Sequence, residues 1–396
     1  MTTIQSSEPV YHTSVTGLLP IVGSVFLGFL AVGLPLAALP IEMRDHLGCS
    51  PATIGATIGL QSLATLATRH RAGTLSDQHG PRRAVLIGLP VAALSGLAYL
   101  FAGSLPIGPD ATLAILIFGR LVMGLGESLF LTGLMSWGIA RLGADRTGKV
   151  MSWTGIAIYA ALGSGAPMGL ALQSALGFVG VGCAVVVAPL LAGTIAVMMS
   201  PVAAAGGDRV PFHRVLALIW RPGVILALSM VPFAVIVAFL ALEFSERNWA
   251  AQSGTALFGF GLAYVLVRLV ASGLPDRFGA ARVAIGSLVF EALGQVTIWL
   301  APNAAFAVLG ATLTGFGFSL IFPAMGVLAT RSVAPELRGR AVGNFIAFAD
   351  IALGVTGPTV GFAVQRFGTP SAFSIGALST LLALALLRSV RLGRTS

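Results

Sequence analysis

Charged side chains are scarce in this chain of 396 residues. Asp, Glu, Lys and Arg together make up 9% of it, whereas soluble domains carry roughly 25%. Lys149 is the only lysine, and no glycine-rich phosphate loop carries a lysine, which excludes a Walker-type nucleotide site. Hydrophobic residues make up 56% of the chain. This composition is typical of a membrane protein.

Cysteines and metal-binding patterns are equally sparse. The two cysteines, Cys49 and Cys183, do not form a disulfide framework, and no spacing of His, Cys and carboxylates is typical of a metal site. The net charge of +9 could indicate a nucleic-acid partner, but the basic residues lie in short loops between apolar runs. We therefore expect no enzyme activity, no cofactor, no metal and no nucleic-acid partner.

Long apolar runs dominate the rest of the sequence. Each run is close to the roughly 20 residues that a helix needs to cross a bilayer. The runs cover residues 16–39, 53–71, 84–104, 111–133, 150–171, 177–199, 222–242, 254–273, 282–301, 305–330, 343–363 and 371–388. The sequence thus predicts an all-α membrane protein with twelve transmembrane helices.

The distribution of arginine and lysine tests this helix count. With both termini on one side, that side holds 17 of the 23 basic residues and the other side holds 3. The remaining three, Arg69, Arg120 and Arg268, fall within the runs. Cytoplasmic loops carry an excess of basic residues, so we expect both termini in the cytoplasm of a multi-pass inner (plasma) membrane protein.

The sequence also repeats itself internally, which fixes the domain organisation. Asp77 and Asp276 lie 199 residues apart, and the same offset relates Arg69 to Arg268, Gly80 to Gly279 and Arg83 to Arg282. An offset of 191 relates Tyr159 to Asp350 and Pro167 to Pro358. We expect a six-helix bundle in residues 1–199, a cytoplasmic linker in 200–220 and a second six-helix bundle in 221–396.

The stretch after the second run has a distinctive pattern, Gly-x-Leu-x-Asp-x-x-Gly-x-Arg-Arg. It consists of Gly73, Leu75, Asp77, Gly80, Arg82 and Arg83. In an apolar context this pattern resembles the signature loop of the major facilitator superfamily. The alternative is a plain basic turn that only sets topology. The second copy, with Asp276 and Arg282, keeps the carboxylate as well as a basic residue, which favours the resemblance.

The resemblance extends over essentially the whole chain and implies a fold and a mechanism. Members of this superfamily place two six-helix bundles around a site near the bilayer midplane, and they alternate access to it by rocking. The resemblance also implies that Asp77 helps to hold the cytoplasmic side closed against the other half. No ATP is needed for such secondary transport.

The fourth run carries two charged residues that are candidates for proton coupling. Arg120, followed by glycines, resembles the superfamily's fourth-helix motif and lies near mid-bilayer, where a charge is costly and usually functional. Glu127 follows seven residues later on the same helix face, about 10 Å along the axis, so a direct salt bridge is not favoured. The alternatives are a structural arginine bound to carbonyls and a buried neutral glutamate.

Two residues at matching positions of the halves are candidates for the central cavity. Asp350 lies in the eleventh run, and its equivalent in the fifth run is Tyr159, so we expect the carboxylate to face a phenol and not a charge. For Glu291, in the ninth run, we expect a structural ion pair with Arg268 of the eighth run. A structural role for Asp350 is the alternative reading.

The fifth run resembles the motif typical of the antiporter branch of the superfamily. Its glycines allow close helix approach and its proline bends the run. The motif comprises Gly163, Gly165, Pro167 and Gly169, with Gly357 and Pro358 as its counterpart in the other half. The family has glycine before the proline, where this chain has Ala166, which weakens the distinction between antiporter and symporter. A generic kinked packing helix is the alternative.

The function that follows is proton-coupled efflux of a small organic solute, with protons as the coupling ion and the lipid bilayer as the medium. The chain is similar to drug:proton antiporters, including their YhhS-like subgroup, and we expect a monomer. One alternative is a proton-coupled uptake symporter. The other is a non-transporting membrane sensor that keeps the transporter fold.

Overall fold

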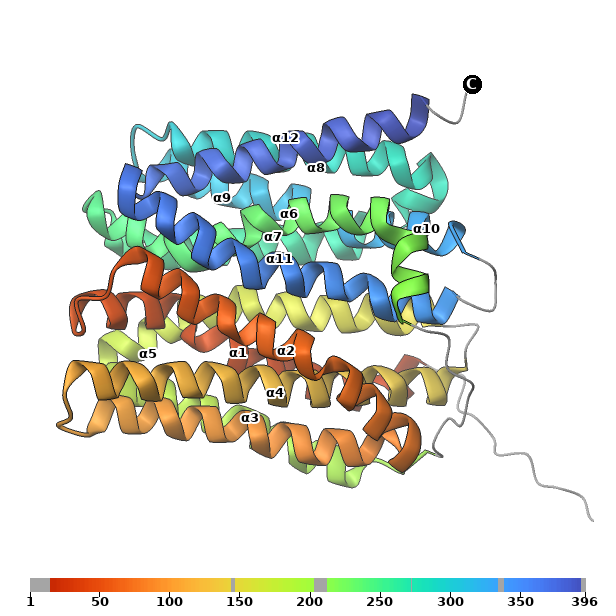
Figure 1. Ribbon diagram of the computed structural model, residues 1–396, viewed down its shortest axis with the longest axis horizontal. Coiled ribbons are helices and arrows are strands. Elements are labelled where there is room, and N and C mark those ends of the chain that lie inside the picture. Colours follow the sequence, from red (N-terminus) through yellow and green to blue (C-terminus); the bar gives the residue numbers. More distant parts are fainter. Residues whose placement is uncertain (1–14, 144–146, 203–211, 272, 334–337, 393–396) are drawn as a thin grey trace, which may run out of the picture.

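The computed structural model describes residues 15–143, 147–202, 212–271, 273–333 and 338–392. These residues form long helices that run nearly parallel to one another (Figure 1). The first five are α1 (Leu19–Asp45), α2 (Pro51–His79), α3 (Pro81–Ser104), α4 (Pro109–Leu142) and α5 (Thr147–Met198). The others are α6 (Phe212–Glu246), α7 (Ala250–Ala271), α8 (Ala280–Trp299), α9 (Ala304–Phe318), α10 (Ile321–Arg331), α11 (Arg338–Phe367) and α12 (Pro370–Leu392).

These helices provide the twelve expected crossings. Ten helical stretches of the described residues are long and apolar enough to span a membrane. One of them is α5, which contains two crossings separated at Gly177, where the backbone is non-helical (φ 69°, ψ −174°). Another joins α9 and α10 into one crossing. The twelfth is α2, which fails the hydropathy test because its buried face carries threonines and a glutamine.

Several helices extend beyond the apolar runs of the sequence. The second run was expected to end at residue 71 and the fourth at 133, but α2 continues to His79 and α4 to Leu142. Hydropathy marks the segment in contact with lipid, whereas the helix continues into the polar region. The expected connector 200–220 is shorter than predicted because α6 begins at Phe212, and residues 203–211 lie outside the described part of the chain.

The turn between α2 and α3 is a single residue. Residues 73–79 of the expected signature loop are the last turns of α2, and Gly80 reverses the chain at φ 88°, a conformation that favours glycine. Pro81 then begins α3, at a position where its missing N–H removes no hydrogen bond. Gly279, its counterpart in the repeat, has the same φ of 88° and precedes α8.

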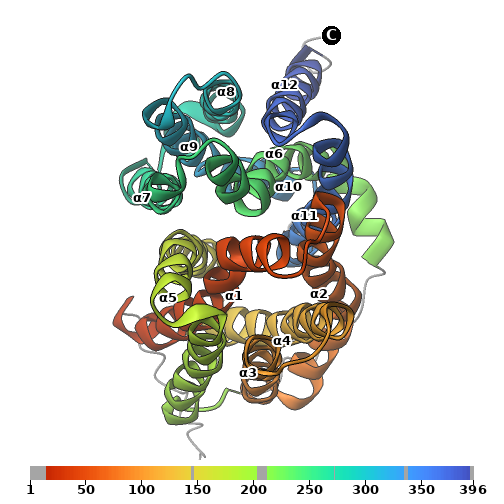
Figure 2. The same cartoon turned by 90° about the vertical axis from the view of Figure 1, so that its left-hand side faces the viewer.

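The helices form two groups that meet along two seams. Helices α1–α5 make one group and α6–α12 the other (Figure 2). The first seam packs α2 on α11 and the second packs α5 on α7. We call the end of the bundle that carries Val15, Gly80 and Leu392 the basic end, and the other, with residues 46–50 and Gly368, the opposite end.

Contacts between the groups close the molecule at the opposite end. Arg44 of α1 donates a hydrogen bond to Ser245 of α6 (2.8 Å). A Cβ atom on Gly361 of α11 would lie 2.6 Å from the carbonyl oxygen of Pro51 of α2. Backbones at this separation leave no space between the two helices, so the ends of α2 and α11 are sealed here.

Candidate functional site

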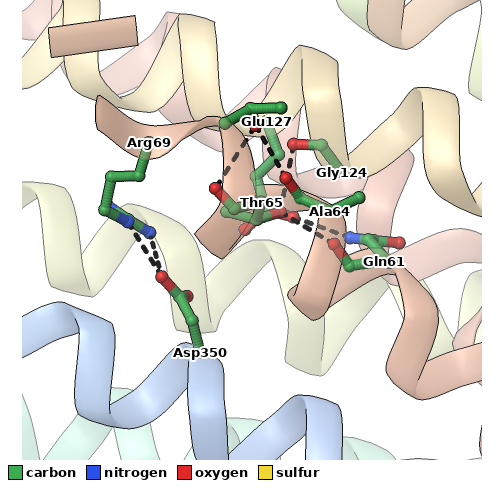
Figure 3. Close-up of polar contacts among 8 residues, drawn as sticks. Gln61, Ala64, Thr65, Arg69, Gly124, Glu127 and Asp350 are labelled. Atoms are coloured by element: carbon green, nitrogen blue, oxygen red, sulfur yellow. Dashed lines mark hydrogen bonds and ion pairs between the residues drawn. The ribbon is translucent and has the colours of Figure 1, made fainter. Parts of the chain in front are cut away.

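A row of polar side chains follows one face of α2 toward the seam with α11 (Figure 3). Gln61, Thr65 and Arg69 are spaced four residues apart, which places them on the same side of a helix. The hydroxyl of Thr65 donates to the carbonyl oxygen of Gly124 on α4 (3.0 Å). This row is the reason that α2 is polar although it lies within the membrane-spanning bundle.

Glu127 of α4 lies beside this row and contacts its first residue, Gln61 (Figure 3). Its Oε2 accepts a hydrogen bond from Nε2 of Gln61 (2.7 Å). The two helices approach closely because Gly124 has no side chain, and a Cβ atom there would overlap the backbone of Gln61. The carboxyl of Glu127 remains partly exposed between the helices and interacts electrostatically with Arg69, Arg120 and Asp350.

Asp350 of α11 forms an ion pair across the seam with Arg69. Its Oδ2 lies 2.6 Å from Nη2 and 2.8 Å from Nε of Arg69, and both side chains are largely buried. The expectation that Asp350 faces Tyr159 instead of a charge is therefore wrong. Sequence spacing within each half does not reveal a partner 281 residues away, because packing of the two groups brings them together.

Arg120 is buried beside this cluster, with 2% of its surface exposed. Its Nη2 donates a long hydrogen bond to the carbonyl oxygen of Ile58 on α2 (3.4 Å), while Nε and Nη1 have no partner among the described residues. No direct ion pair between Arg120 and Glu127 is formed in the described part of the chain, which agrees with their separation along α4. The guanidinium thus retains unused donors near a carboxylate.

Tyr159 lies at the second seam, among aromatic rings of the other group. Its ring centroid is 4.1 Å from that of Tyr264 on α7, 5.3 Å from Phe318 on α9 and 5.7 Å from Phe233 on α6. We call these four residues the aromatic cluster. It joins α5 to three helices of the other group.

The expected ion pair between Arg268 and Glu291 is not formed. Nη1 of Arg268 donates instead to the carbonyl oxygen of Ser319 (3.0 Å). Glu291 is fully buried, and neither carboxyl oxygen has a hydrogen-bond partner among the described residues. Arg268 faces the carbonyl at the end of α9, so the expected depths of the two residues did not predict the contact.

The glycines of the antiporter-like motif are packing positions at the helix crossings. The Cα atoms of Gly163 and Gly261 meet where α5 crosses α7. Gly165 and Gly169 pack on α1, and Gly357 packs on Gly55 of α2. Pro358 touches Gly59, where an added Cβ would lie 3.1 Å from its Cδ. Pro167 lies beside Gly254 of α7. A side chain at the Gly163 or Gly357 crossing would force the two groups apart.

The residues of the signature pattern gather at the basic end. Arg82 donates to the carbonyl oxygen of Val197 near the end of α5 (3.0 Å), where a helix C-terminus favours a cation. Arg83 and Arg282 are exposed. Gly73 and Asp77 lie in the last turns of α2. Asp276 lies in the short turn Pro275–Gly279 that precedes α8, and its side chain is not among the described ones.

Comparison with known proteins decides the family. The family model of the Major Facilitator Superfamily matches this chain twice, over residues 21–245 and 223–395. The chain belongs to the Major Facilitator Superfamily. The double match agrees with the internal repeat of the sequence.

Relatives of this superfamily member are also named as transporters. An uncharacterized MFS-type transporter of Salmonella typhimurium is 41% identical over 95% of this chain and 96% of its own. Another, from Burkholderia mallei, is 40% identical over 93% of this chain and 90% of its own. This member of the superfamily is accordingly a multi-pass membrane transporter of small molecules.

Solved structures show the same fold. A D-xylose-proton symporter aligns over 94% of this chain and 96% of its own, with a TM-score of 0.74 and 14% identity. A variant of the nucleoside transporter NupG aligns over 94% and 99%, with a TM-score of 0.72 and 16% identity. Identities this low indicate a common fold and leave the substrate open.

Sequence reasoning missed Gln61, Thr65 and Arg69 as parts of the site. The first two are ordinary polar residues in a helical run, and no pattern distinguishes them. Arg69 did carry a signal, since it is one of three basic residues within the apolar runs and is repeated as Arg268. Such a charge inside a membrane helix is expected to have a partner.

Proposed function

We propose that this transporter exports a small organic solute in exchange for protons. Residues 1–199 and 221–396, joined by 200–220, rock as two bundles around a site between them. Glu127 carries the proton, while Arg69 and Asp350 connect its charge to the position of the two bundles. This assignment places the chain with the drug:proton antiporter-like branch and its YhhS-like subgroup.

The observation that carries this proposal is the ion pair of Arg69 with Asp350, on the same face of α2 as Gln61, which holds Glu127. Arg69 pairs with Asp350 of the other bundle and interacts electrostatically with Glu127 of its own bundle. Rocking that separates α2 from α11 removes Asp350 from Arg69, but Glu127 moves together with Arg69. The charge on Glu127 therefore affects how easily the seam opens.

The direction of this coupling follows from electrostatics. An ionised Glu127 can compensate Arg69 after Asp350 has moved away, so loss of the proton favours the open seam. A protonated Glu127 cannot do so, and it favours the closed ion pair between Arg69 and Asp350. Each cycle of opening and closing then binds and releases a proton, which is what exchange requires.

The proposal is tested with purified protein in proteoliposomes that contain a pH-sensitive dye. A panel of organic acids, amines and sugars is added, and proton movement induced by each solute is recorded. Exchange moves protons against the solute, whereas an uptake symporter moves them in the same direction. A sensor without transport gives no movement with any solute that binds. The sign of the signal thus separates the three functions.

Glu127→Gln is the decisive variant, with Glu291→Gln as its control. Glu291 is a fully buried carboxyl on α8, a helix that packs against neither helix of the first seam. We expect Glu127→Gln to abolish proton-driven transport and to retain exchange of solute for solute. Proton-driven transport that survives in Glu127→Gln would assign the proton to Asp350 instead.

We propose a cytoplasmic location for the basic end, in the inner (plasma) membrane. Asp110 at the opposite end and Ser332 at the basic end are both exposed. In a chain without Cys49 and Cys183, a cysteine at Asp110 should react with an impermeant maleimide in intact cells. A cysteine at Ser332 should react only after permeabilisation, and the reverse pattern would contradict this orientation.

A further inference from the structure

Arg268 is a buried cation without a carboxylate partner among the described residues. Only 2% of its surface is exposed, and its Nη1 donates to the carbonyl oxygen of Ser319 (3.0 Å). Its Nε has no partner within the described part of the chain. Leaving a buried charge uncompensated is strongly unfavourable, and such charges are normally paired. The guanidinium therefore has capacity for an anion that the protein itself does not supply.

The internal repeat explains why this anion is missing. Arg268 is the repeat of Arg69, and Tyr159 is the repeat of Asp350. At the first seam Arg69 pairs with Asp350. At the second seam Arg268 faces α5 one turn before Tyr159, since a Cβ atom on Gly155 would lie 3.3 Å from Nη2 of Arg268.

The two seams thus have equivalent arginines but different partners. A carboxylate completes the first seam, and a phenol stands at the equivalent position in the second. Tyr159 and Tyr264 both interact electrostatically with Arg268, and Tyr159 also interacts with the more distant Asp350 and Glu291. The hydroxyl of Tyr264 is buried and has no hydrogen-bond partner in the described chain. Two donors, from Arg268 and Tyr264, are therefore left without acceptors beside the aromatic cluster.

The aromatic cluster provides faces for a flat ring next to these donors. Phe233 and Phe318 stack with centroids 5.4 Å apart and planes 7° apart. Tyr159, from the first bundle, meets Phe233 and Phe318 edge to face and lies 4.1 Å from Tyr264 at an interplanar angle of 35°, while Tyr264 also contacts Phe318 directly. Because Tyr159 belongs to the first bundle and the other three rings to the second, rocking of the bundles withdraws Tyr159 from Tyr264 and Phe318 and leaves space for a ring beside them.

We propose that Arg268 and the aromatic cluster bind the transported solute, and that this solute is a small planar aromatic carboxylate. The inference rests on the proposed transport function and names its substrate class. The carboxylate pairs with Arg268, whose planar fork suits it, and also accepts from the hydroxyl of Tyr264. The ring of the solute stacks on Phe318 and Tyr264 in place of the Tyr159 ring.

Other solute classes fit this site less well. An organic cation would be repelled by Arg268, which forms no ion pair with a carboxylate among the described residues. A sugar needs many hydrogen-bond partners, and the cluster offers aromatic faces with only a few donors. The aromatic acid alone uses both the unpaired guanidinium and the rings.

The test measures binding to the full-length protein in lipid nanodiscs near neutral pH, without any pH gradient. The probes are naphthoate, its neutral amide naphthamide, and the saturated acid decahydronaphthoate. We expect naphthoate to bind at least about tenfold more tightly than either analogue, because each analogue lacks one of the two interactions. Equal binding of the three probes, or no binding of naphthoate, would overturn the proposal.

Variants assign the binding to these residues. Arg268→Gln should remove the preference for naphthoate over naphthamide, and Phe318→Leu should remove the preference over decahydronaphthoate. Phe290→Leu is the control, because Phe290 packs edge to face against Phe316 on the exposed surface of the same bundle. It should bind naphthoate like the wild type, and an equal loss in this control would contradict the assignment to Phe318.

Tyr159→Asp provides a test that does not remove the arginine. It places a carboxylate where the first seam has Asp350, so that Arg268 gains an internal partner. We expect naphthoate binding to fall by at least about tenfold, while Tyr159→Phe keeps it. Undiminished binding in Tyr159→Asp would overturn the proposal even if Arg268→Gln does not fold. Loss of proton coupling with intact naphthoate binding would instead contradict the transport proposal alone.

Discussion

Asp350→Asn is the substitution that most directly tests how the two bundles are held together. The ion pair that it breaks joins α2 to α11, and its side chains are 15% and 9% exposed for Arg69 and Asp350. Removing one partner of a buried pair costs about 3–5 kcal/mol, because the other charge stays buried. The asparagine oxygen still accepts one hydrogen bond, so we take the lower value of about 3 kcal/mol.

A penalty of this size changes the population of conformers substantially. Each 1.4 kcal/mol corresponds to about a tenfold change in an equilibrium constant. The population with a closed first seam should therefore fall roughly a hundredfold relative to the open conformers. The loss is directional, because Arg69 lies 10 residues from the end of α2 and thus toward the basic end. We expect opening of the bundle at the basic end in particular.

The measurement uses pairs of spin labels in lipid nanodiscs. Gln78 of the first bundle and Ser332 of the second are exposed at the basic end, and His46 and Arg366 are exposed at the opposite end. In Asp350→Asn the distance between the labels at Gln78 and Ser332 should become longer. The distance between the labels at His46 and Arg366 should not change, because the contacts at the opposite end are kept. Unchanged distributions at both ends would refute the assignment of this ion pair as a latch.

A second variant separates loss of the pair from loss of the charge. Arg69→Gln combined with Asp350→Asn leaves no unpaired charge, so most of the penalty should disappear. We expect its distances to return toward those of the wild type. A double variant that opens as widely as Asp350→Asn alone would show that the unpaired guanidinium is not the cause.

The glycine crossings and the basic turns give the remaining predictions. Gly163→Val should abolish transport, because its side chain would collide with the backbone of Gly261. Gly193 has open space around it, so Gly193→Val should transport like the wild type. Uptake of radiolabelled solute into vesicles measures both variants. Asp77→Asn should reduce the same transport strongly at unchanged expression. Asp276→Asn should be milder, since its turn lacks the double arginine, and wild-type transport in both would contradict a gating role.

The fold was largely predictable from the sequence because membrane helices follow simple rules. The apolar runs and the arginine distribution gave twelve helices, although α2 itself fails a hydropathy test. The run around residues 53–71 was still recognised because residues 53–67 contain no charged side chain. Helix ends were less predictable, since α2 and α4 continue past the apolar region, where hydropathy carries no information.

The partners within the site were less predictable than its members. Asp350, Tyr159, Arg120 and Glu127 were identified as charges or phenols in membrane helices, and all four lie between or beside the seams. Their contacts depend on the packing of one bundle on the other, which residue spacing does not encode. The repetition of Arg69 as Arg268 carried the missing information, because an arginine present in both halves is expected to have a partner in each half.

The difference between the two seams has a mechanistic consequence. In the exchange cycle that we propose, the ion pair that closes the first seam depends on the charge of Glu127 and therefore responds to protons. The second seam, closed by aromatic rings beside Arg268, responds in this proposal to an aromatic anion. Because the same rocking motion opens both seams, a proton at the first and a solute at the second compete for one conformational equilibrium. In this proposal, the presence of a phenol at Tyr159 and a carboxylate at Asp350 gives the two repeats separate roles in one exchange cycle.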